Sequence, residues 1–363
     1  KSGRSAPWER TAERCPQSDG RRTMVLFHVV VTAAAAAVGA CAAVGDVEWF
    51  NTNVYPQLKG GGGPGDFTCD DKLRCDGGVV TQILLGRTDL SGTLPPALGL
   101  MTRLDTLALN DNKLTGTLLT EIGQLHALRT LHVYGNKLTG TVPVQLAAAV
   151  KLASVRLDSN GLTGGIPGAL GALPELTYLG FNGNSLSGTI PGLLLSSASL
   201  VELNVAGNEL VGDLPGGPFA VGAGGTRLQV LRANRNKLNG VVAPDIGKLT
   251  ELRLLHVHEC QLTALPPDIG KLEKLNELFA QRNRIVGTLA TELGLMRSLV
   301  HLVLHDNQIT GTLPSEIGEL TALNSFQLYS NKLSGSIPMT VANMHTLRVL
   351  RLDGNSLDGA LTP

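Results

Sequence analysis

Aliphatic residues recur along most of this chain with a period close to 24 residues, and polar residues recur in step with them. The shared pattern is LxxLxLxxNxLxGxIPxxLGxL, and twelve units align on its Asn position. These positions are 88, 112, 136, 160, 184, 208, 236, 260, 283, 307, 331 and 355, with Thr88 and Cys260 in place of Asn. We number the units one to twelve by this position. Such a repeat predicts one elongated domain, because each unit can hide its apolar face only against its neighbours.

Each unit is expected to contain one short strand. In the third unit Leu131 and Val133 alternate with the polar residues Thr130 and His132, which predicts two side chains pointing inward and two pointing outward. Strands of successive units should pair in parallel about 4.8 Å apart, so that the inward leucines form continuous buried rows.

The Asn position predicts a buried column of amides at the ends of these strands. An amide carries both a donor and an acceptor, and it can satisfy backbone groups where the chain leaves the sheet. Beside Thr88, the predicted column consists of Asn112, Asn136, Asn160, Asn184, Asn208, Asn236, Cys260, Asn283, Asn307, Asn331 and Asn355. The Gly and Pro that follow predict an extended return limb and then a short helical turn at xxLGxL.

The N-terminal part predicts export from the cytosol. The chain begins at Lys1, and Met24 is the expected start, which leaves 1–23 as a disordered or spurious extension. Residues 24–45 are apolar, follow two arginines and end in small residues, as a secretory signal peptide does. An uncleaved signal anchor is the alternative, since about 20 apolar residues can span a bilayer.

The repeated limb LxGxIPxxLGxL resembles that of the plant-type extracellular leucine-rich repeat family, and the resemblance covers residues 79–363, with the last unit truncated. It implies an α/β-type leucine-rich repeat solenoid. In that fold, a right-handed superhelix carries a parallel β-sheet on its concave face and extended segments with short 3-10 turns on its convex side. Residues 46–78 resemble the family's N-terminal capping region, and this resemblance implies a disulfide between Cys69 and Cys75.

Composition excludes several classes of function. Lys plus Arg and Asp plus Glu are both 30, so no net field attracts nucleic acid. No nucleophile motif, facing carboxylate pair or kinase signature occurs, so we predict no enzyme activity and no cofactor. His256, His258 and His305 are too far apart on the predicted sheet to share zinc, and we therefore predict no metal site.

The outward positions of the strands are the expected ligand surface. Units seven to ten are richest there in Arg, His and aromatic residues, which are common at binding interfaces. The candidate residues are Arg232, Asn234, Arg235, His256, His258, Glu259, Phe279, Gln281, Arg282, His301, His305 and Asp306. A merely solvated face is the alternative, and so many histidines also allow a pH-dependent interface.

These observations predict an extracellular, non-catalytic recognition module that binds a protein, peptide or glycan on the concave face. We expect it to be secreted or to lie on the outer face of the plasma membrane, attached through 24–45 or through a C-terminal segment missing from this sequence. The resemblance leaves three alternatives open. They are the ectodomain of a receptor kinase, an inhibitor of microbial wall-degrading enzymes, and a wall or matrix scaffold.

Overall fold

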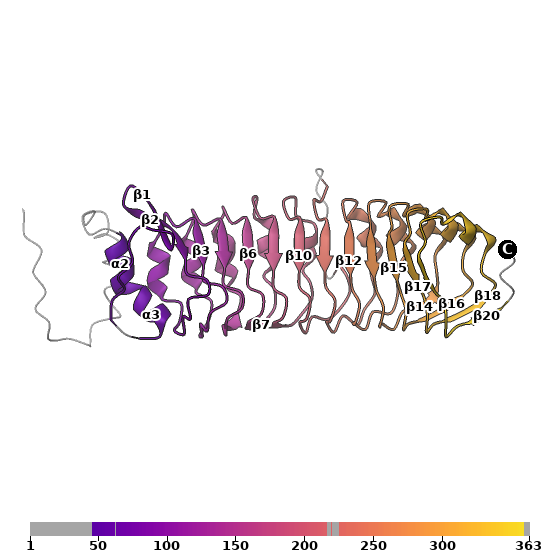
Figure 1. Cartoon of the computed structure of the whole chain (residues 1–363), viewed down its shortest axis with the longest axis horizontal. Coiled ribbons are helices and arrows are strands. Elements are labelled where there is room, and N and C mark those ends of the chain that lie inside the picture. The colour runs from indigo at the N-terminus through magenta and orange to yellow at the C-terminus, as the bar shows by residue number, and fades with distance from the viewer. Residues whose placement is uncertain (1–45, 62, 216–218, 220–224, 359–363) are drawn as a thin grey trace, which may run out of the picture. The chain divides into compact units, whose positions relative to one another are not determined.

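The twelve repeat units form a row of successive coils in the structure, a computed structural model (Figure 1). It describes residues 46–61, 63–215, 219 and 225–358. The expected extension 1–23 and the expected signal segment 24–45 lie outside the described residues.

Each coil contributes one short strand to a long sheet in which strands from consecutive units are neighbours. β1 is antiparallel to β2. The strands that follow are parallel to their neighbours, and each residue lies opposite the equivalent residue of the neighbouring unit. The strands in spatial order are β1 (Leu73–Asp76), β2 (Val79–Leu84), β3 (Thr106–Ala108), β4 (Thr130–His132), β6 (Ser154–Arg156), β8 (Tyr178–Gly180), β10 (Glu202–Asn204), β11 (Val230–Arg232), β12 (Leu254–His256), β13 (Glu277–Phe279), β15 (His301–Val303), β17 (Ser325–Gln327) and β19 (Val349–Arg351).

The inward side of this sheet is the core. Leu131 and Val133 are fully buried, and the equivalent Leu107 and Leu109 of the preceding coil are buried as completely. Burying each such side chain contributes about 1.5–3 kcal/mol, most of which the entropy of the ordered chain offsets. The predicted leucine rows and the predicted parallel sheet are confirmed.

Short 3-10 turns cover the opposite side of the coils. Gly171 shows why the pattern requires glycine there, because a β-carbon at this position would lie 2.3 Å from the carbonyl oxygen of Leu193 in the next turn. The turns are η1 (Pro96–Leu100), η2 (Thr120–Gln124), η3 (Val144–Ala148), η4 (Gly168–Ala172), η5 (Pro244–Lys248), η6 (Pro267–Lys271), η7 (Thr291–Leu295), η8 (Ser315–Glu319) and η9 (Met339–Asn343), with the short helix α4 (Gly192–Leu195) in unit five.

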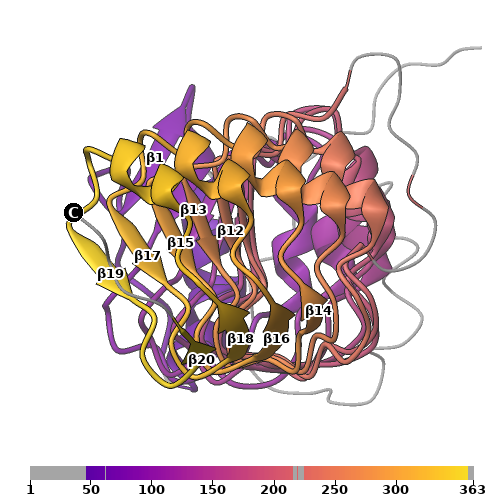
Figure 2. The same ribbon diagram turned by 90° about the vertical axis from the view of Figure 1, so that its right-hand side faces the viewer.

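The extended return limbs also pair with one another and form two further parallel sheets, the second of which is seen end-on in Figure 2. The first consists of β5 (Thr139–Thr141), β7 (Gly161–Gly164) and β9 (Ser185–Leu186), and the second of β14 (Val286–Thr288), β16 (Gln308–Gly311), β18 (Lys332–Gly335) and β20 (Ser356–Leu357). The gap between them falls on units six to eight. Unit six is four residues longer and unit eight one residue shorter than the others, which breaks the register of the limbs.

The Asn column joins each coil to the one before it. Asn136 donates from Nδ2 to the carbonyl oxygens of Leu109 and Val133, at 3.0 Å each, and its Oδ1 accepts from the backbone N–H of Leu114 at 2.9 Å. At Thr88 and Cys260, which stand in place of Asn in this column, the hydrogen bonding is poorer. The Thr88 hydroxyl donates only to Leu85, and the Cys260 thiol makes long contacts of 3.5 and 3.6 Å to carbonyl oxygens.

The N-terminal end of the core is closed by two short helices and a hairpin. The helices are α2 (Asp46–Asn53) and α3 (Tyr55–Lys59), and the hairpin is β1 with β2. Phe50 is fully buried against the rings of Tyr55 and Phe67. Cys69 and Cys75 form a disulfide across the start of β1. This end of the leucine rows is thereby shielded from water.

Candidate ligand surface on the sheet face

The outward face of the long sheet carries four parallel rows of side chains. In unit eight they are Leu254 in row one, His256 in row two, His258 in row three and Glu259 in row four. Rows one and two are the first and third residues of each strand, whereas rows three and four follow the strand. Row four has left-handed backbone conformation, with φ of 54° at Glu259. The regular strand register therefore stacks residues of neighbouring units directly beside one another.

The structure brings the predicted ligand residues together on adjacent coils. They fall in row one (His301), row two (Arg232, His256, Phe279), row three (Asn234, His258, Gln281, His305) and row four (Arg235, Glu259, Arg282, Asp306). We call this set the central patch. Most of it lies beyond the ends of the three-residue strands, so the strands are shorter than the sequence pattern indicates.

The row-four charges of the central patch neutralise one another. Arg235 Nε lies 3.1 Å from a carboxylate oxygen of Glu259, and Arg282 lies 3.6 Å from Glu259 and 3.7 Å from Asp306. These side chains are largely exposed, so each pair is worth little on its own. Arg232 in row two is likewise paired with Glu202 of the preceding strand. The patch consequently offers few unpaired charges to a ligand.

Aromatic rings occupy the centre of the patch. The ring of His256 stacks on Phe279 with centroids 4.4 Å apart and an interplanar angle of 2°. His258 and His301 meet Phe279 edge-on, at 6.4 and 6.3 Å. His256 Nε2 also bonds Glu277 at 2.9 Å. Together these rings form a preorganised apolar platform with polar nitrogens at its margin.

Burial lowers the pKa of His256 and His258. For His256 the loss of water outweighs the hydrogen bond that its Nε2 donates to Glu277, which raises the pKa. For His258 burial acts together with the neighbouring His256 ring. Its Nδ1 is buried and, among the described residues, has no hydrogen-bond partner, as is also true of Gln281 Oε1 in the next coil. His256 and His258 are therefore neutral at physiological pH.

A second cluster on the same face was not among the predicted ligand residues, which all belong to units seven to ten. The Arg156 guanidinium lies 4.0 Å from the ring centroid of Tyr134 and 5.7 Å from that of Tyr178. Its Nε donates to Asp158 Oδ2 at 3.1 Å. Asp158 is only 3 % exposed, and burial raises its pKa despite the Arg156 partner. A repeated sequence signal, YxN followed by RLD one unit later, marks this cluster and one other place in the chain.

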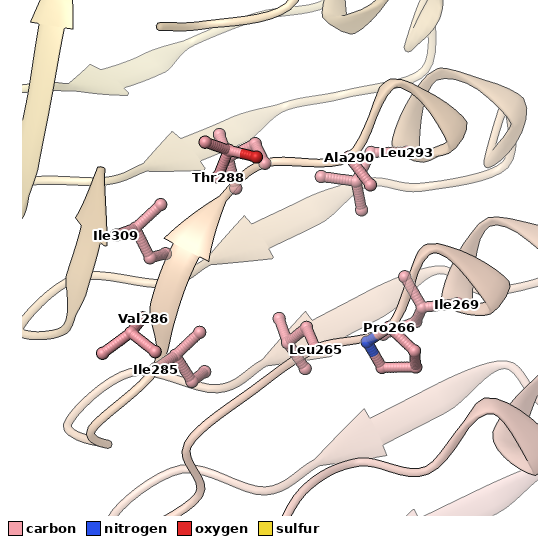
Figure 3. Close-up of a pocket in the computed structure, with 10 residues that line it drawn as sticks. Leu265, Pro266, Ile269, Ile285, Val286, Thr288, Ala290, Leu293 and Ile309 are labelled. Atoms are coloured by element: carbon pink, nitrogen blue, oxygen red, sulfur yellow. The ribbon is translucent and has the colours of Figure 1, made fainter. Parts of the chain in front are cut away.

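Two pockets formed by described residues lie away from the sheet face. One apolar pocket sits between the return limbs of units eight and nine and is lined by residues such as Leu265, Ile285 and Leu289 (Figure 3). It adjoins the limb that is one residue short. A more polar one lies beside Asp66 and Lys72 in the N-terminal cap. Neither shares a residue with the central patch.

Among the described residues, no group of three or more His, Cys, Asp or Glu side chains is arranged to hold a metal ion. No helix in the same part of the chain has the length and apolar character to cross a bilayer. Burial raises the pKa of the Cys260 thiol to about 11, which keeps it protonated and unreactive at neutral pH.

Comparison with known proteins identifies relatives of this architecture. Residues 226–362 match a family model described as a leucine-rich repeat region. The Arabidopsis receptor kinase HAESA, solved with the peptide hormone IDA and the co-receptor SERK1, is 30 % identical at a TM-score of 0.68, over 80 % of this chain and 49 % of that one. The plant peptide hormone receptor RGFR1, solved with RGF2, is 30 % identical at a TM-score of 0.65, over 76 % of this chain and 48 % of that one.

The likeness extends beyond plant receptors. A leucine-rich repeat protein of Leptospira interrogans is 29 % identical at a TM-score of 0.53, over 77 % of this chain and 73 % of that one. This chain spans about half the length of the plant receptor chains it matches. No curated protein matches it in sequence.

Proposed function

Since this chain is a leucine-rich repeat protein of the plant type, we propose that it is a non-catalytic recognition module that binds a peptide or protein segment on its sheet face. The sheet face is the surface on which twelve coils align their outward side chains in register. Such a regular, open strip suits an extended partner better than a small molecule, which needs an enclosing pocket.

The central patch is the proposed contact site, and the stack of His256 on Phe279 is the observation that carries it. Binding energy concentrates in a few rigid aromatic or Arg side chains surrounded by groups that exclude water. The Phe279 platform has this character. The ion pairs around it are satisfied within the protein, so we expect the partner to contribute an apolar or aromatic side chain here.

An extracellular location agrees with the cap. The Cys69–Cys75 disulfide belongs to the chemistry of secreted and cell-surface proteins, because cytosolic thiols are kept reduced. Determining the N-terminal residue of the secreted protein would test this part of the proposal. A mature N-terminus upstream of Met24 would contradict it.

The binding site is tested by capturing a partner with the full chain from the extracellular fraction and measuring its affinity for two variants. We expect Phe279→Ala to weaken binding about thirtyfold or more, corresponding to about 2 kcal/mol for a central aromatic contact. Thr106→Ala, on the same face in unit two, is the matched control and should leave affinity unchanged. Full affinity of a folded Phe279→Ala/His256→Ala variant would exclude the central patch.

A receptor ectodomain is the second candidate, because two of the similar structures are described as receptors and this chain spans about half of their length. The test is to extend the reading frame past Pro363. A second apolar span followed by a kinase signature would establish the receptor, and a stop codon soon after further repeat units would favour the secreted form.

A further inference from the structure

The return limbs of units one to four carry threonines on their outward side. The step Thr-Gly-Thr places two threonines on the same face of the limb, because side chains alternate along an extended chain. Threonines of neighbouring limbs also lie directly opposite each other in the pairing register. The opposed pairs are Thr93 with Thr115, Thr117 with Thr139, and Thr141 with Thr163. We call these six residues the threonine array.

The array is a regular series of two alternating steps. From Thr115 to Thr117 the step runs along one limb and covers about 6.6 Å over two residues. From Thr117 to Thr139 it crosses to the next limb, which lies about 4.8 Å away. The two steps are close to perpendicular, since one follows the strand and the other follows the hydrogen bonds between strands. The six side chains therefore occupy points of one rectangular grid.

Every member of the array is exposed to solvent, and contacts with the adjacent coils hold it in position. The first threonine of a step bonds to the coil before it, as Thr139 Oγ1 donates to the Gly116 carbonyl at 3.2 Å. The second threonine packs its methyl group beside a glycine of the next coil. A β-carbon built on Gly140 would lie 2.9 Å from Thr117 Cγ2. The hydroxyl oxygens are therefore fixed before anything binds to them.

These hydroxyls keep the capacity to bind water. Among the described residues, the hydroxyls of Thr93, Thr117 and Thr141 make no hydrogen bond, so each can donate once and accept twice. The Thr139 hydroxyl uses its proton within the protein but still accepts. The array thus offers donors and acceptors to a layer of water at regular positions.

We propose that the threonine array binds ice, by holding a layer of water in the positions that water has on a prism face of the crystal. The oxygen atoms on that face form a rectangular grid whose two repeats are close to the two steps of the array. Because the hydroxyls are already fixed, ordering the water beside them costs little entropy. This activity goes beyond the proposed recognition function and does not depend on it.

A crystal is the ligand that such an array suits best. One hydroxyl holds one water weakly, and a dissolved molecule would meet only a few of these groups. Ice repeats the same spacing without limit, so many weak contacts form together once the first are made. The six threonines span four coils, and each adds its contact to the same crystal face.

The same arrangement recurs on the second limb sheet. Thr288 lies opposite Thr310, whose Oγ1 donates to the Gly287 carbonyl at 3.1 Å. In units six and seven, Val211 and Val241 occupy the corresponding outward positions of the limbs. The threonines are therefore interrupted where the pairing of the limbs is interrupted. Figure 2 shows the second limb sheet on a different side of the coils from the long sheet.

The test measures how the full secreted chain affects ice. We expect fluorescently labelled wild-type protein to become incorporated into a growing ice crystal and, at micromolar concentration, to stop the recrystallisation of fine-grained ice. Thr117→Lys places a long charged side chain in the middle of the array, and it should raise the required concentration about tenfold or more. Thr141→Lys should have the same effect at a second site. Thr117→Lys/Thr310→Lys, which disrupts both limb sheets, should be excluded from ice.

Val241→Lys is the matched control, because it makes the same change at an exposed limb position outside the array. It should keep full activity on ice, and urea denaturation of each variant verifies that the solenoid is folded. Phe279→Ala should also keep full activity on ice, whereas Thr117→Lys should keep full affinity for a captured partner. Exclusion of the wild-type protein from growing ice would overturn the inference and leave the proposed recognition function standing. An equal loss of activity in Val241→Lys and Thr117→Lys would overturn it too.

Discussion

The methyl group of Thr141 occupies the space that a side chain on Gly164 would need, because a β-carbon built on Gly164 would lie 2.8 Å from Thr141 Cγ2. The same contact joins other return limbs, for example Thr117 with Gly140 and Thr288 with Gly311. The first threonine of each Thr-Gly-Thr step instead bonds backward, as Thr139 Oγ1 does to the Gly116 carbonyl at 3.2 Å. The repeated sequence step is thus a contact between coils.

Gly164→Ala should destabilise the protein more than Gly188→Ala. Both glycines have left-handed φ, of 75° and 78°, which costs alanine about 1–2 kcal/mol. Gly188 has no atom within 4 Å of its β-carbon position, because Gly165 stands where other units have threonine. The added clash at Gly164 should cost about 1–3 kcal/mol more in the free energy of unfolding, measured by urea denaturation.

Trimming the opposing methyl group provides the check on this explanation. In the double variant Thr141→Ser/Gly164→Ala, the clashing carbon is removed and the excess over Gly188→Ala should largely disappear. Equal losses for Gly164→Ala and Gly188→Ala would show that the Thr141 contact contributes nothing beyond backbone strain.

Cys260→Asn should stabilise the solenoid. The thiol makes only long contacts with the carbonyl oxygens of Ala233 and His258, whereas Asn208 at the equivalent place makes bonds of 2.9–3.1 Å to Leu186, Phe181 and Val205. A buried backbone group that gains a partner contributes about 1 kcal/mol. We therefore expect the free energy of unfolding to rise by about that amount.

Asn208→Ala is the reciprocal variant and should cost about 3 kcal/mol or more, because it leaves buried backbone groups of two coils unpaired. Cys260→Ser, which adds a hydroxyl without the second polar atom of an amide, should change stability less than Cys260→Asn. A lower denaturation midpoint for Cys260→Asn would contradict this prediction and would show that the column at unit eight has no room for the larger Asn side chain.

Most of the fold could be predicted from the sequence because its cause is local and repeated. The alternation around Leu131 and the fixed distance to Asn136 determine strand and turn within each unit, and repetition determines their stacking. The two return-limb sheets were not predicted, since the pattern shows an extended limb but not its partner. Their interruption follows from length changes in units six and eight, whose effect on register appears only when the coils are stacked.

The candidate site was predictable in position but not in chemistry. Residue type placed Arg235 and Arg282 on the outward face, but it could not show that Glu259 and Asp306 neutralise them. Conversely, the sequence of its own unit does not show the aromatic partner of Arg156. Its aromatic contact is with Tyr134, one coil earlier. Such a contact between coils can be predicted only from the strand register, which becomes visible once the sequences of neighbouring units are aligned.

Acidification below about pH 6.5 should destabilise the protein through three partly buried histidines. Burial lowers the pKa of His132, His256 and His258 in the folded state. As the pH falls below the usual value of about 6.5, the unfolded chain takes up protons first, so the free energy of unfolding decreases. Each histidine can contribute at most about 1.4 kcal/mol per pH unit.

Urea denaturation at about pH 7.5, 6.5 and 5.5 measures how the free energy of unfolding depends on pH. The variant His256→Gln/His258→Gln should show a shallower loss than the wild type over the same range. Taking the difference between the two proteins cancels Asp158, whose raised pKa acts in the opposite direction. A difference that stayed constant with pH would show that these two histidines do not gain protons on unfolding.

Removing the Cys69–Cys75 bond should loosen the N-terminal cap while the distant coils stay intact. The bond closes a short loop, since the two cysteines are separated by 6 positions in the sequence, and the chain-entropy relation gives about 2 kcal/mol for a loop of this size. Coils interact chiefly with their neighbours, so the effect should stay near α2, α3 and β1. In Cys69→Ser/Cys75→Ser, we expect faster hydrogen exchange and protease cleavage around residues 46–84 and unchanged protection in units five to eleven.

Wild-type protein treated with dithiothreitol should behave in the same way, because Cys260 is buried and takes no part in the bond. Loss of protection along the whole solenoid would mean that the cap is required for the folding of every coil.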